Sequence, residues 1–462
     1  MIIRKLRLLT LGLCVVLLLT SCKQQTSKLP ELNQLNVVLI VIDTLGAKHL
    51  EAYNPDLQNS PNITALARAG VRFERAYAPA PWTKPSIASI FTSKLPSEHK
   101  LRDLHDTLAP EAKTIASYLG EQGLLTFGRV SHVFLNKKEG FANGFQDYEV
   151  VNFRGNVHKA ITSKTVSDQA LKWLERRQAD SEQKNFFMFL HYFDPHYNYQ
   201  HHAQYDRTSG YSGPLKPGMD IRKLRKLIPQ LTKADINYLV GLYHEEIAYT
   251  DAQIGRVIDQ LKQNGLADNT MIIVTADHGE EFLEHDHIGH TRTLYDELIN
   301  VPLIFYLPKY FSARVVSENV STMDILPTLL SFDSKSSASG LFAGISLKSV
   351  LTGGALPPED RHIFSEVDFR SSSIKAYKAG VREQNLKLIF DKPTKLWELQ
   401  ELIKDPAELN DQQQSLPGDF KRLKPILEGF VSKQGDLPNK PQADSQSKTP
   451  QEVEQLKTLG YM

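Results

Sequence analysis

The chain has 462 residues, of which 41% are hydrophobic and 23% are charged, close to the average for folded globular proteins. The 54 Lys and Arg residues nearly balance the 53 Asp and Glu residues, and the formal net charge of +1 excludes a general attraction to nucleic acid or to anionic membrane surfaces. The negative mean hydropathy excludes a polytopic membrane protein.

The first residues have the pattern of an export signal. A basic stretch precedes an uncharged apolar run at residues 8–19, which is short for a bilayer span and typical of a signal peptide. The run ends in Leu19-Thr20-Ser21-Cys22, which resembles the bacterial lipobox, whose cysteine is lipidated and begins the mature protein. A simpler interpretation is an ordinary secretory signal with an incidental cysteine. We expect a signal peptide at residues 1–21 and lipidation at Cys22.

The segment after the signal predicts where the protein is held. Residues 22–35 are mostly polar and are expected to form the lipidated cysteine and a tether. Lys23 rather than Asp follows the cysteine, which in Gram-negative bacteria points to the outer membrane. Cys14 leaves with the signal, so no disulfide is expected. The expected location is the bacterial cell envelope, with a lipid anchor in the outer membrane and the protein facing the periplasm or the cell surface.

Four uniformly apolar runs are predicted to be strands buried on both faces of a sheet. These runs are Asn36–Ile42, Phe186–Leu190, Met271–Val274 and Val301–Tyr306. Segments of helical character lie between them, at residues 62–69, 113–119, 167–177 and 239–261. Strands that alternate with helices predict an α/β fold with a doubly wound, largely parallel sheet and helices on both faces.

Residues of the metal-ligand type follow three of these runs. Asp43 follows the first, Asp194 and His196 follow the second, and Asp277 and His278 follow the third. Ligand sites in such sheets lie beyond the carboxyl ends of the strands, so these side chains are expected at one edge. Each acid alone would more often be a turn or helix-cap residue. Three runs with such residues at the same end favour a functional site.

Thr83 lies in a rigid, proline-rich loop before a segment of helical character, Ile87–Phe91. One interpretation is that Thr83 caps this helix, with Pro85 in its first turn. The other is that its hydroxyl is a nucleophile, because a helix N-terminus and a bound metal both favour an alkoxide. Together with Asp43 and the Asp277-His278 pair, the nucleophile is favoured.

The pattern changes after residue 332, where a stretch containing Ser and Gly predicts a connection. Short strand-like runs then follow at residues 362–365, 376–381 and 386–390. We expect a smaller C-terminal α+β subdomain at residues 333–434. Residues 435–462 begin with a stretch rich in Pro, Gln, Lys, Ser and Asp and are expected to form a flexible segment and a C-terminal tail.

Taken together, the motifs resemble those of the sulfatase family of the alkaline phosphatase superfamily, over most of the chain. The most specific is Thr275-Ala276-Asp277-His278-Gly279-Glu280-Glu281-Phe282, followed by Gly289-His290 and Leu294-Tyr295-Asp296-Glu297. The other segments that carry the resemblance are Asn36–Leu45, Ser60–Ile63, Gly70–Phe73, Ala76–Ser86, His191–His196, Glu246–Asp251, Val301–Ile304, Asp324–Thr328, Asp405–Asn410 and Leu459–Tyr461.

The resemblance implies a catalytic domain, here residues 36–332, that hydrolyses an ester at a metal-bound nucleophile. Its metal ligands fall on Asp43, Asp277 and His278, and its nucleophile, which completes the metal shell, falls on Thr83. Its substrate-binding or leaving-group residues fall on His196 and His290. In this scheme the metal lowers the pKa of the hydroxyl, and one of the two histidines protonates the leaving oxygen.

Two departures bear on the activity. Sulfatases carry Cys or Ser at the position of Thr83 and convert it to formylglycine, and the Arg that ends the conversion motif is Ile87 here. Threonine resembles instead the phosphodiesterase and phosphotransferase branches of the superfamily. Gly46 and Lys48 stand where close relatives often carry an arginine and an aspartate. These changes put full activity, or the usual substrate, in question.

The proposed ligands give two oxygen donors and one nitrogen, which suits Mn²⁺, Zn²⁺ or Ca²⁺ without deciding among them. A second ion would need donors such as Asp194, His196 and His290. Relatives with two metals space their first pair as Asp-x-x-x-His, which Asp194-Pro195-His196 does not match. One metal is therefore favoured, and two stay possible.

The leading hypothesis is a metal-dependent hydrolase that cleaves a phosphate or, less favoured, a sulfate ester of a small molecule, glycan or lipid. One alternative is a transferase that moves a head group onto an envelope acceptor, although such transferases usually carry several membrane spans. Another is a catalytically inactive lipoprotein that keeps the fold and only binds. Specificity is expected to lie in loops such as residues 100–106 and 197–225.

Overall fold

The computed structural model describes residues 29–151, 161–178, 183–334, 340–354, 361–371 and 374–434, together with residues 454, 456, 457 and 461. The predicted signal peptide, Cys22 and residues 23–28 of the predicted tether therefore lie outside the described residues, as do residues 435–453. The end of the predicted tether does not hang free, because Leu32 and Leu35 are buried in the core. Within the described ranges, no helix has the length and apolar composition needed to cross a membrane.

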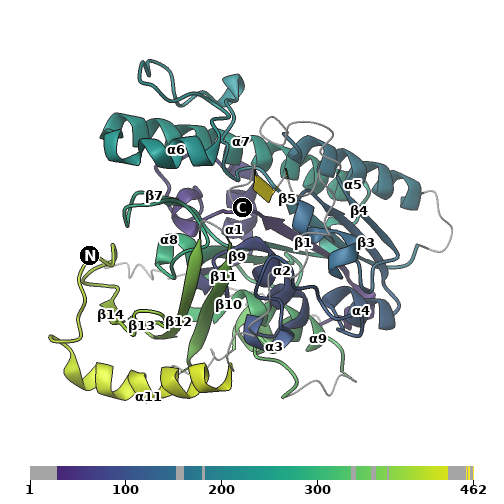
Figure 1. Cartoon of the computed structure of the whole chain (residues 1–462). Coiled ribbons are helices and arrows are strands. Elements are labelled where there is room, and N and C mark those ends of the chain that lie inside the picture. The colour runs from purple at the N-terminus through teal and green to yellow at the C-terminus, as the bar shows by residue number, and fades with distance from the viewer. Residues whose placement is uncertain are drawn as a thin grey trace, which may run out of the picture.

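An eight-stranded sheet forms the centre of the molecule (Figure 1), with the strand order β10-β2-β9-β6-β1-β5-β3-β4. Its strands are β1 (Asn36–Ile42), β2 (Val71–Tyr77), β3 (Leu125–Val130), β4 (Asp147–Val150), β5 (Phe186–Tyr192), β6 (Thr270–Ala276), β9 (Asn300–Tyr306) and β10 (Arg314–Ser321). Only β9 runs antiparallel to its neighbours, β2 and β6. The prediction of a largely parallel sheet is confirmed.

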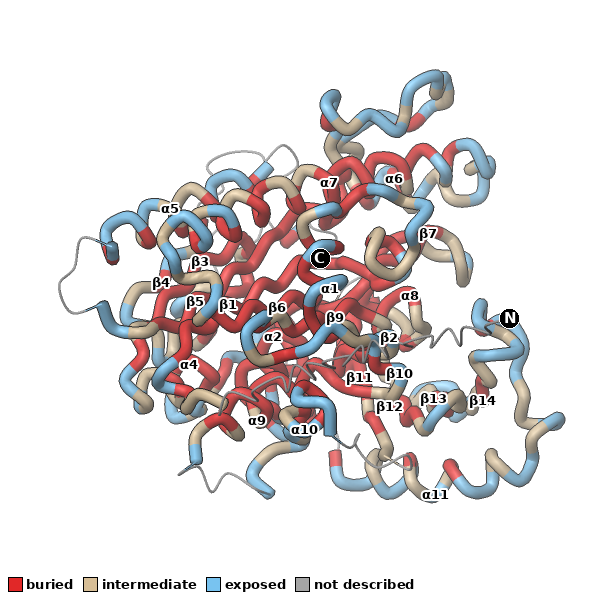
Figure 2. The backbone as a smooth tube through the Cα atoms, turned by 180° about the vertical axis from the view of Figure 1, so that it is seen from behind, coloured by how far each residue is buried: buried red, intermediate tan, exposed pale blue. Residues whose placement is uncertain are grey.

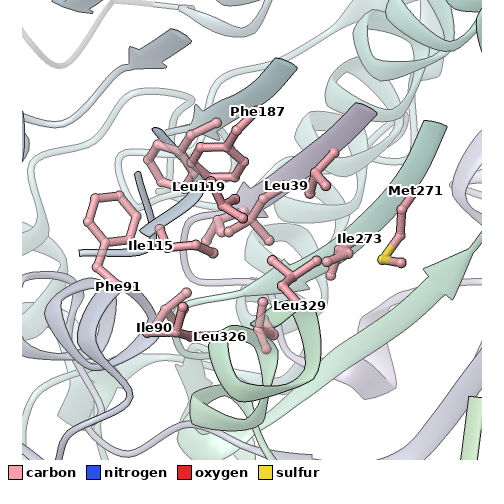
Figure 3. Close-up of a cluster of buried hydrophobic side chains, with 14 of the residues drawn as sticks. Leu39, Ile90, Phe91, Ile115, Leu119, Phe187, Met271, Ile273, Leu326 and Leu329 are labelled. Carbon is pink, nitrogen blue, oxygen red and sulfur yellow. The ribbon is translucent and has the colours of Figure 1, made fainter. Parts of the chain in front are cut away.

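Helices cover both faces of this sheet because the alternate side chains of β1 are apolar on both sides. Val37, Leu39 and Val41 belong to one apolar cluster, and Val38 and Ile40 belong to another. Figure 3 shows part of the first cluster, including Leu39. It packs against α2 (Thr83–Thr92), α4 (Ile115–Glu121), α9 (Ile325–Leu330) and α10 (Lys348–Leu351). The second packs against α1 (Pro61–Ala69), α5 (Ser163–Gln178), α6 (Ile221–Leu227) and α7 (Lys233–Gln263).

In Figure 2 the inner strands β1, β5 and β6 are buried throughout, which is the environment that the apolar runs of the sequence require, whereas the edge strands β4 and β10 are partly exposed. The remaining short elements are α3 (Pro96–His99), α8 (Asp296–Ile299) and a two-stranded ribbon of β7 (Glu281–Phe282) and β8 (Ile288–Gly289). This ribbon follows β6 directly in the chain, at the carboxyl end of the sheet.

The later part of the chain forms a second, antiparallel sheet in the order β11-β12-β13-β14. Its strands are β11 (Ile363–Arg370), β12 (Lys375–Glu383), β13 (Leu386–Asp391) and β14 (Trp397–Glu401). α11 (Pro417–Lys433) covers one face through an apolar cluster that includes Leu388, Leu399 and Leu423. β11 is joined to the loop before α2, because the Glu366 amide donates to Pro79 O at 2.9 Å.

A buried group of charges joins the second sheet to the loop before β9. Lys387 of β13 is 1% exposed, and its ammonium group donates to Leu294 O at 2.9 Å and to Asp296 Oδ1 at 2.8 Å. The same ammonium pairs with the Glu408 carboxylate, and Arg382 of β12 pairs with Asp296. Two cations and two anions therefore balance in a largely buried site, in which Asp296 alone is partly exposed.

Lys387→Met is expected to lower the free energy of unfolding by about 3–5 kcal/mol, because it leaves the buried Glu408 carboxylate without its paired cation, while Asp296 keeps Arg382. Denaturant unfolding measures the loss. The control is Lys378→Met on the neighbouring strand β12, where a partly exposed pair with Asp391 should contribute about 1 kcal/mol or less. Equal losses in the two variants would contradict this account.

Candidate active site

The register between β1 and β6 brings the first candidate ligands together. Ile42 of β1 is paired with Ala276 of β6 in a parallel ladder, so the next residues, Asp43 and Asp277, leave the sheet side by side. The Thr44 amide donates to Asp277 Oδ1 at 3.2 Å, which holds the two strand ends together. One donor atom from each of Asp43, Asp277 and His278 lies within 4.8 Å of the others.

Thr83 is the first residue of α2 and lies against these ligands. The residue in the N-cap position is Trp82, so the helix-cap interpretation of Thr83 is wrong. The Thr83 hydroxyl donates toward Asp43 Oδ1 at 3.5 Å and lies 3.3 Å from His278 Nε2. Ser86, one turn later, donates from its hydroxyl to Asp277 O at 2.6 Å and fixes the helix start against β6.

The electrostatics of this cluster fit a bound cation. Asp43 and Asp277 are fully buried, and Oδ2 of each has no hydrogen-bond partner among the described residues. Burial and then the Asp277 charge raise the pKa of Asp43 well above its usual value, and burial raises the pKa of Asp277. His278 donates from Nδ1 to Gly279 O at 2.9 Å, which leaves the lone pair of Nε2 facing the carboxylates. Such a donor set suits a divalent metal ion.

Two further histidines, which the sequence did not indicate as site residues, lie close to Asp43. His191 Nε2 lies 3.6 Å and His132 Nε2 lies 3.9 Å from Asp43 Oδ2. Both rings are fully buried, and burial lowers the pKa of each, so both are neutral. His191 is the next-to-last residue of β5, the neighbour of β1, and His132 follows the end of β3 by two residues. Both therefore obey the strand-end rule that selected Asp43.

His290 and His196 are brought to the same place from different segments. The His290 ring lies 4.5 Å from the His278 ring and 5.0 Å from the His196 ring, measured between centroids. His290 Nδ1 lies 2.8 Å from Glu280 Oε1, so Nδ1 donates its proton to the carboxylate, and Nε2 of the neutral ring carries the lone pair. His196 donates from Nδ1 to Tyr197 O at 3.0 Å, and its Nε2 has no partner among the described residues.

Asp194 does not belong to this group. Its carboxylate accepts from the Thr162 amide at 3.0 Å and from the Ser163 amide at 2.8 Å, so it caps the start of α5. Within the described chain, neither His196 nor His290 belongs to a group of three donors that could hold an ion. The second-metal set of Asp194, His196 and His290 that the sequence left open is therefore not assembled.

A cation near the site comes from the predicted specificity loop. Arg225, on α6, donates from Nε to Ile288 O at 2.9 Å, next to the segment that carries His290. Its guanidinium lies 5.8 Å from the centre of the Tyr197 ring. A side chain at Gly289 would lie 2.4 Å from the guanidinium, and Gly289 has a φ of +108°, so glycine is required there. Lys48, by contrast, is half exposed and pairs with Glu284 at 2.6 Å.

A hydrogen-bonded pair of a histidine and a glutamate close to the site is expected to make the stability of the fold depend on pH. His285 Nδ1 lies 2.6 Å from Glu297 Oε1. Burial opposes a charge on His285, but the hydrogen bond to Glu297 outweighs it and raises the pKa to about 9, from 6.5. Because the folded-state pKa is raised, the pair contributes stability that is fully present below pH 6.5 and is lost as the pH rises through 9.

We expect the free energy of unfolding to fall between pH 6.5 and 9 by on the order of 1 kcal/mol from this pair, after a discount for its partial exposure to solvent. Denaturant unfolding of the wild type and His285→Gln at both pH values measures the effect. Glutamine does not titrate, so the fall should be smaller in the variant. The same pH dependence in both proteins would contradict the assignment.

Comparisons with known proteins identify the family of the chain. Residues 35–332 match the family model described as Sulfatase, and residues 284–421 match the model described as N-sulphoglucosamine sulphohydrolase, C-terminal. The chain is 24% identical to an N-acetylglucosamine-6-O-sulfatase of Bacteroides thetaiotaomicron, over 85% of each chain. It is 25% identical to human iduronate 2-sulfatase, over 71% of this chain and 69% of the other.

Solved structures share the fold. One, in complex with its substrate D-glucosamine-2-N,6-O-disulfate, has a TM-score of 0.72 at 20% identity and covers 89% of this chain and 100% of the other. A phosphonate monoester hydrolase from Silicibacter pomeroyi has a TM-score of 0.70 at 21% identity and covers 87% and 96%. The family match spans more than half of the chain, from before β1 to beyond α9. The chain is therefore an ester hydrolase of the sulfatase family.

Proposed function

We propose that this protein is a metal-dependent hydrolase of a phosphate or sulfate ester, in which the Thr83 hydroxyl attacks the tetrahedral oxyanion. The observation that carries the proposal is the position of Thr83. Its hydroxyl is buried against Asp43 and His278, at the start of a helix and beside two carboxylate oxygens that have no hydrogen-bond partner in the described part of the chain. With a divalent ion bound by these carboxylates, the hydroxyl would be activated in the way that a nucleophile requires.

Asp43, Asp277, His278 and Thr83 would hold a divalent ion, with Mn²⁺, Zn²⁺ and Ca²⁺ as candidates and one ion favoured. When bound, such an ion lowers the pKa of a hydroxyl ligand and offsets the charge of the ester. The chain itself holds the nucleophile in place, because α2 is fixed by the bond from Ser86 to the backbone of Asp277. It also excludes water, since Thr83, His278 and His290 are fully buried.

The reaction that we propose has two steps. In the first, a bond forms between Thr83 Oγ1 and phosphorus or sulfur while the bond to the leaving oxygen breaks. In the second, water attacks the threonine ester and frees Thr83. Burial keeps the pKa of His290 well below its usual value, so Nε2 begins as a proton acceptor that takes up the proton released by the Thr83 hydroxyl, and Glu280 stabilises the resulting cation. His290, or His196 beside it, then passes that proton to the leaving oxygen.

A phosphoester is the favoured substrate. Threonine cannot be converted to formylglycine by the route that Cys and Ser follow, and Ile87 replaces the arginine of the conversion motif. Some neighbours in fold are phosphonate monoester hydrolases, another was solved with its substrate D-glucosamine-2-N,6-O-disulfate, and a third is described as a 2-O GAG sulfatase. A small-molecule, glycan or lipid ester is therefore proposed as the substrate class.

The test is a parallel assay of the mature chain from residue 23 onward against aryl phosphodiester, phosphomonoester and sulfate, each with Mn²⁺, Zn²⁺ and Ca²⁺. We expect phosphoester turnover that depends on a divalent ion and disappears in Thr83→Ala. Sulfate turnover that survives Thr83→Ala would overturn the proposed mechanism. Metal binding without turnover of any substrate, including glycan and lipid esters, would favour the binding-only alternative.

We also propose that Cys22 anchors the protein in the cell envelope, on the basis of the lipobox-like sequence alone. In cells that are fed radiolabelled palmitate, the wild type should incorporate label and Cys22→Ser should not. Fractionation should place the wild type in the outer membrane and the variant in the periplasm. Label in Cys22→Ser would contradict the anchor.

A further inference from the structure

One more side chain reaches the active site, from a distant part of the chain. The hydroxyl of Tyr461 lies 2.9 Å from His290 Nε2, although the two residues are 171 positions apart. The Thr83 hydroxyl is also near the phenol, close enough to act on its pKa. Because Glu280 holds the Nδ1 proton of His290, the lone pair at Nε2 accepts the Tyr461 proton. The phenol oxygen therefore lies between the proposed nucleophile and the histidine that handles the leaving group.

The ring of Tyr461 is held by an aromatic slot formed by Phe134, Phe369 and Trp82. Its centroid lies 4.9 Å from that of Phe134, 6.0 Å from that of Phe369 and 6.2 Å from that of Trp82. Phe134 meets it edge-on, at an interplanar angle of 65°. The Tyr461 amide donates to Leu456 O at 3.0 Å, and both residues are buried. The contacts are those of a docked ligand: an apolar slot for the ring and one polar partner for the hydroxyl.

The site is closed when Tyr461 is in this slot. Thr83, His278 and His290 have no exposed surface, and His196 is 3% exposed. An ester must place its phosphorus or sulfur within about 3–3.5 Å of Thr83 Oγ1 to react. It must also turn its leaving oxygen toward His290 Nε2. The phenol oxygen already occupies that face of His290, so both cannot be bound at once.

We propose that the slot around Tyr461 is the leaving-group subsite of the enzyme. The Tyr461 side chain occupies this subsite as a phenol tethered to the chain. Substrate therefore binds only when Tyr461 has left the slot. The proposal rests on the function proposed for Thr83 and His290. It makes Tyr461 a residue that determines which leaving groups enter. A protein whose competent state is a minor population shows an apparent affinity reduced by that fraction. Removing Tyr461 should therefore tighten substrate binding.

The experiment uses p-cresol, which is the free side chain of tyrosine, with the metal-loaded wild type, Tyr461→Ala and Tyr461→Phe. In Tyr461→Ala the slot is vacant, so p-cresol should raise the unfolding temperature in a saturable way, while the wild type should not respond. Toluene, which lacks the hydroxyl, should bind more weakly. Tyr461→Phe keeps the ring in the slot, so it should resemble the wild type. No stabilisation of Tyr461→Ala by p-cresol would overturn the proposal.

The kinetic part of the experiment shows whether Tyr461 only occupies the subsite or takes part in the chemical step. Tyr461→Ala should have a KM at least about 5-fold lower than the wild type with kcat within about 3-fold, and p-cresol should inhibit it competitively. If Tyr461 took part in the chemistry instead, kcat would fall and p-cresol would restore it, which would contradict the proposal. Phe369→Ala, which removes a ring that does not contact His290, should lose stability without gaining competitive inhibition.

These measurements also separate the two proposals. The thermal arm needs no turnover, so stabilisation of Tyr461→Ala by p-cresol would support the subsite even if no protein hydrolysed any ester. A different outcome would keep the proposed function and overturn the subsite. In that outcome turnover requires Thr83, but p-cresol neither stabilises nor inhibits Tyr461→Ala.

Discussion

Thr83→Ala is expected to lower kcat/KM for a phosphoester by about 10⁴-fold or more and to leave the fold unchanged. The substitution removes the attacking oxygen, while the α2 backbone, the Ser86 bond to Asp277 and the metal-ligand carboxylates stay in place. Thr83→Ser keeps a hydroxyl at the same position and should lose much less. Initial rates under pseudo-first-order conditions measure the difference.

The matched control is Thr92→Ala, at the other end of the same helix. Thr92 is also buried and donates its hydroxyl to Ala88 O at 2.7 Å, so the two variants lose the same atoms from α2. Thr92→Ala should retain wild-type turnover at temperatures where it is folded. If Thr83→Ala kept activity within 10-fold of the wild type, the nucleophile would have to be another group or a water molecule.

Asp43→Asn should have opposite effects on stability and activity. In the metal-free protein Asp43 is a buried carboxylate beside Asp277, and its Oδ2 has no partner among the described residues. Removing that charge should raise the free energy of unfolding of the metal-free protein by about 1–3 kcal/mol. The same change removes a ligand charge, so metal binding and turnover should be lost.

The contrast is measured by thermal unfolding with EDTA and with added Mn²⁺. The wild type should be stabilised by the ion and the variant should not, since an ion that binds only the folded state stabilises it. Asp251→Asn is the control, because Asp251 accepts from the Ile63 and Asn62 amides at 2.8 and 3.1 Å. A buried acid with satisfied oxygens should lose stability on the same substitution. Destabilisation of metal-free Asp43→Asn would contradict the account.

The strands that the sequence predicts correctly are those whose side chains are apolar on both faces of the sheet. β1 was predicted with the bounds that the structure gives, and β6 extends its predicted run by one residue at the start and two at the end. Because these two strands are adjacent and parallel, their next residues had to meet, and Asp43, Asp277 and His278 follow from that. β3 was not predicted, because Thr126, Gly128 and Arg129 interrupt its apolar pattern. His132, which depends on β3, was missed with it.

Other features depend on contacts that no local pattern encodes. Asp194 satisfies the same strand-end rule as Asp43, yet its carboxylate is used by the backbone of α5. Whether such an acid turns toward the site or toward a helix start is decided by the tertiary structure. In the sequence, residues Leu459–Tyr461 were notable only because they resemble the family. Nothing near residue 461 in the chain indicates that the Tyr461 hydroxyl contacts His290.

The complete burial of α2 limits how this enzyme can vary. All ten residues of the helix are buried, whereas α5 buries Val166, Ala170 and Leu174 at the spacing of one helical face. A helix with a solvent face has positions at which mutations accumulate without effect, and α2 has none. Sequence divergence near the nucleophile is therefore confined to coordinated changes in packing, while new specificities can arise freely in the loops that surround the site.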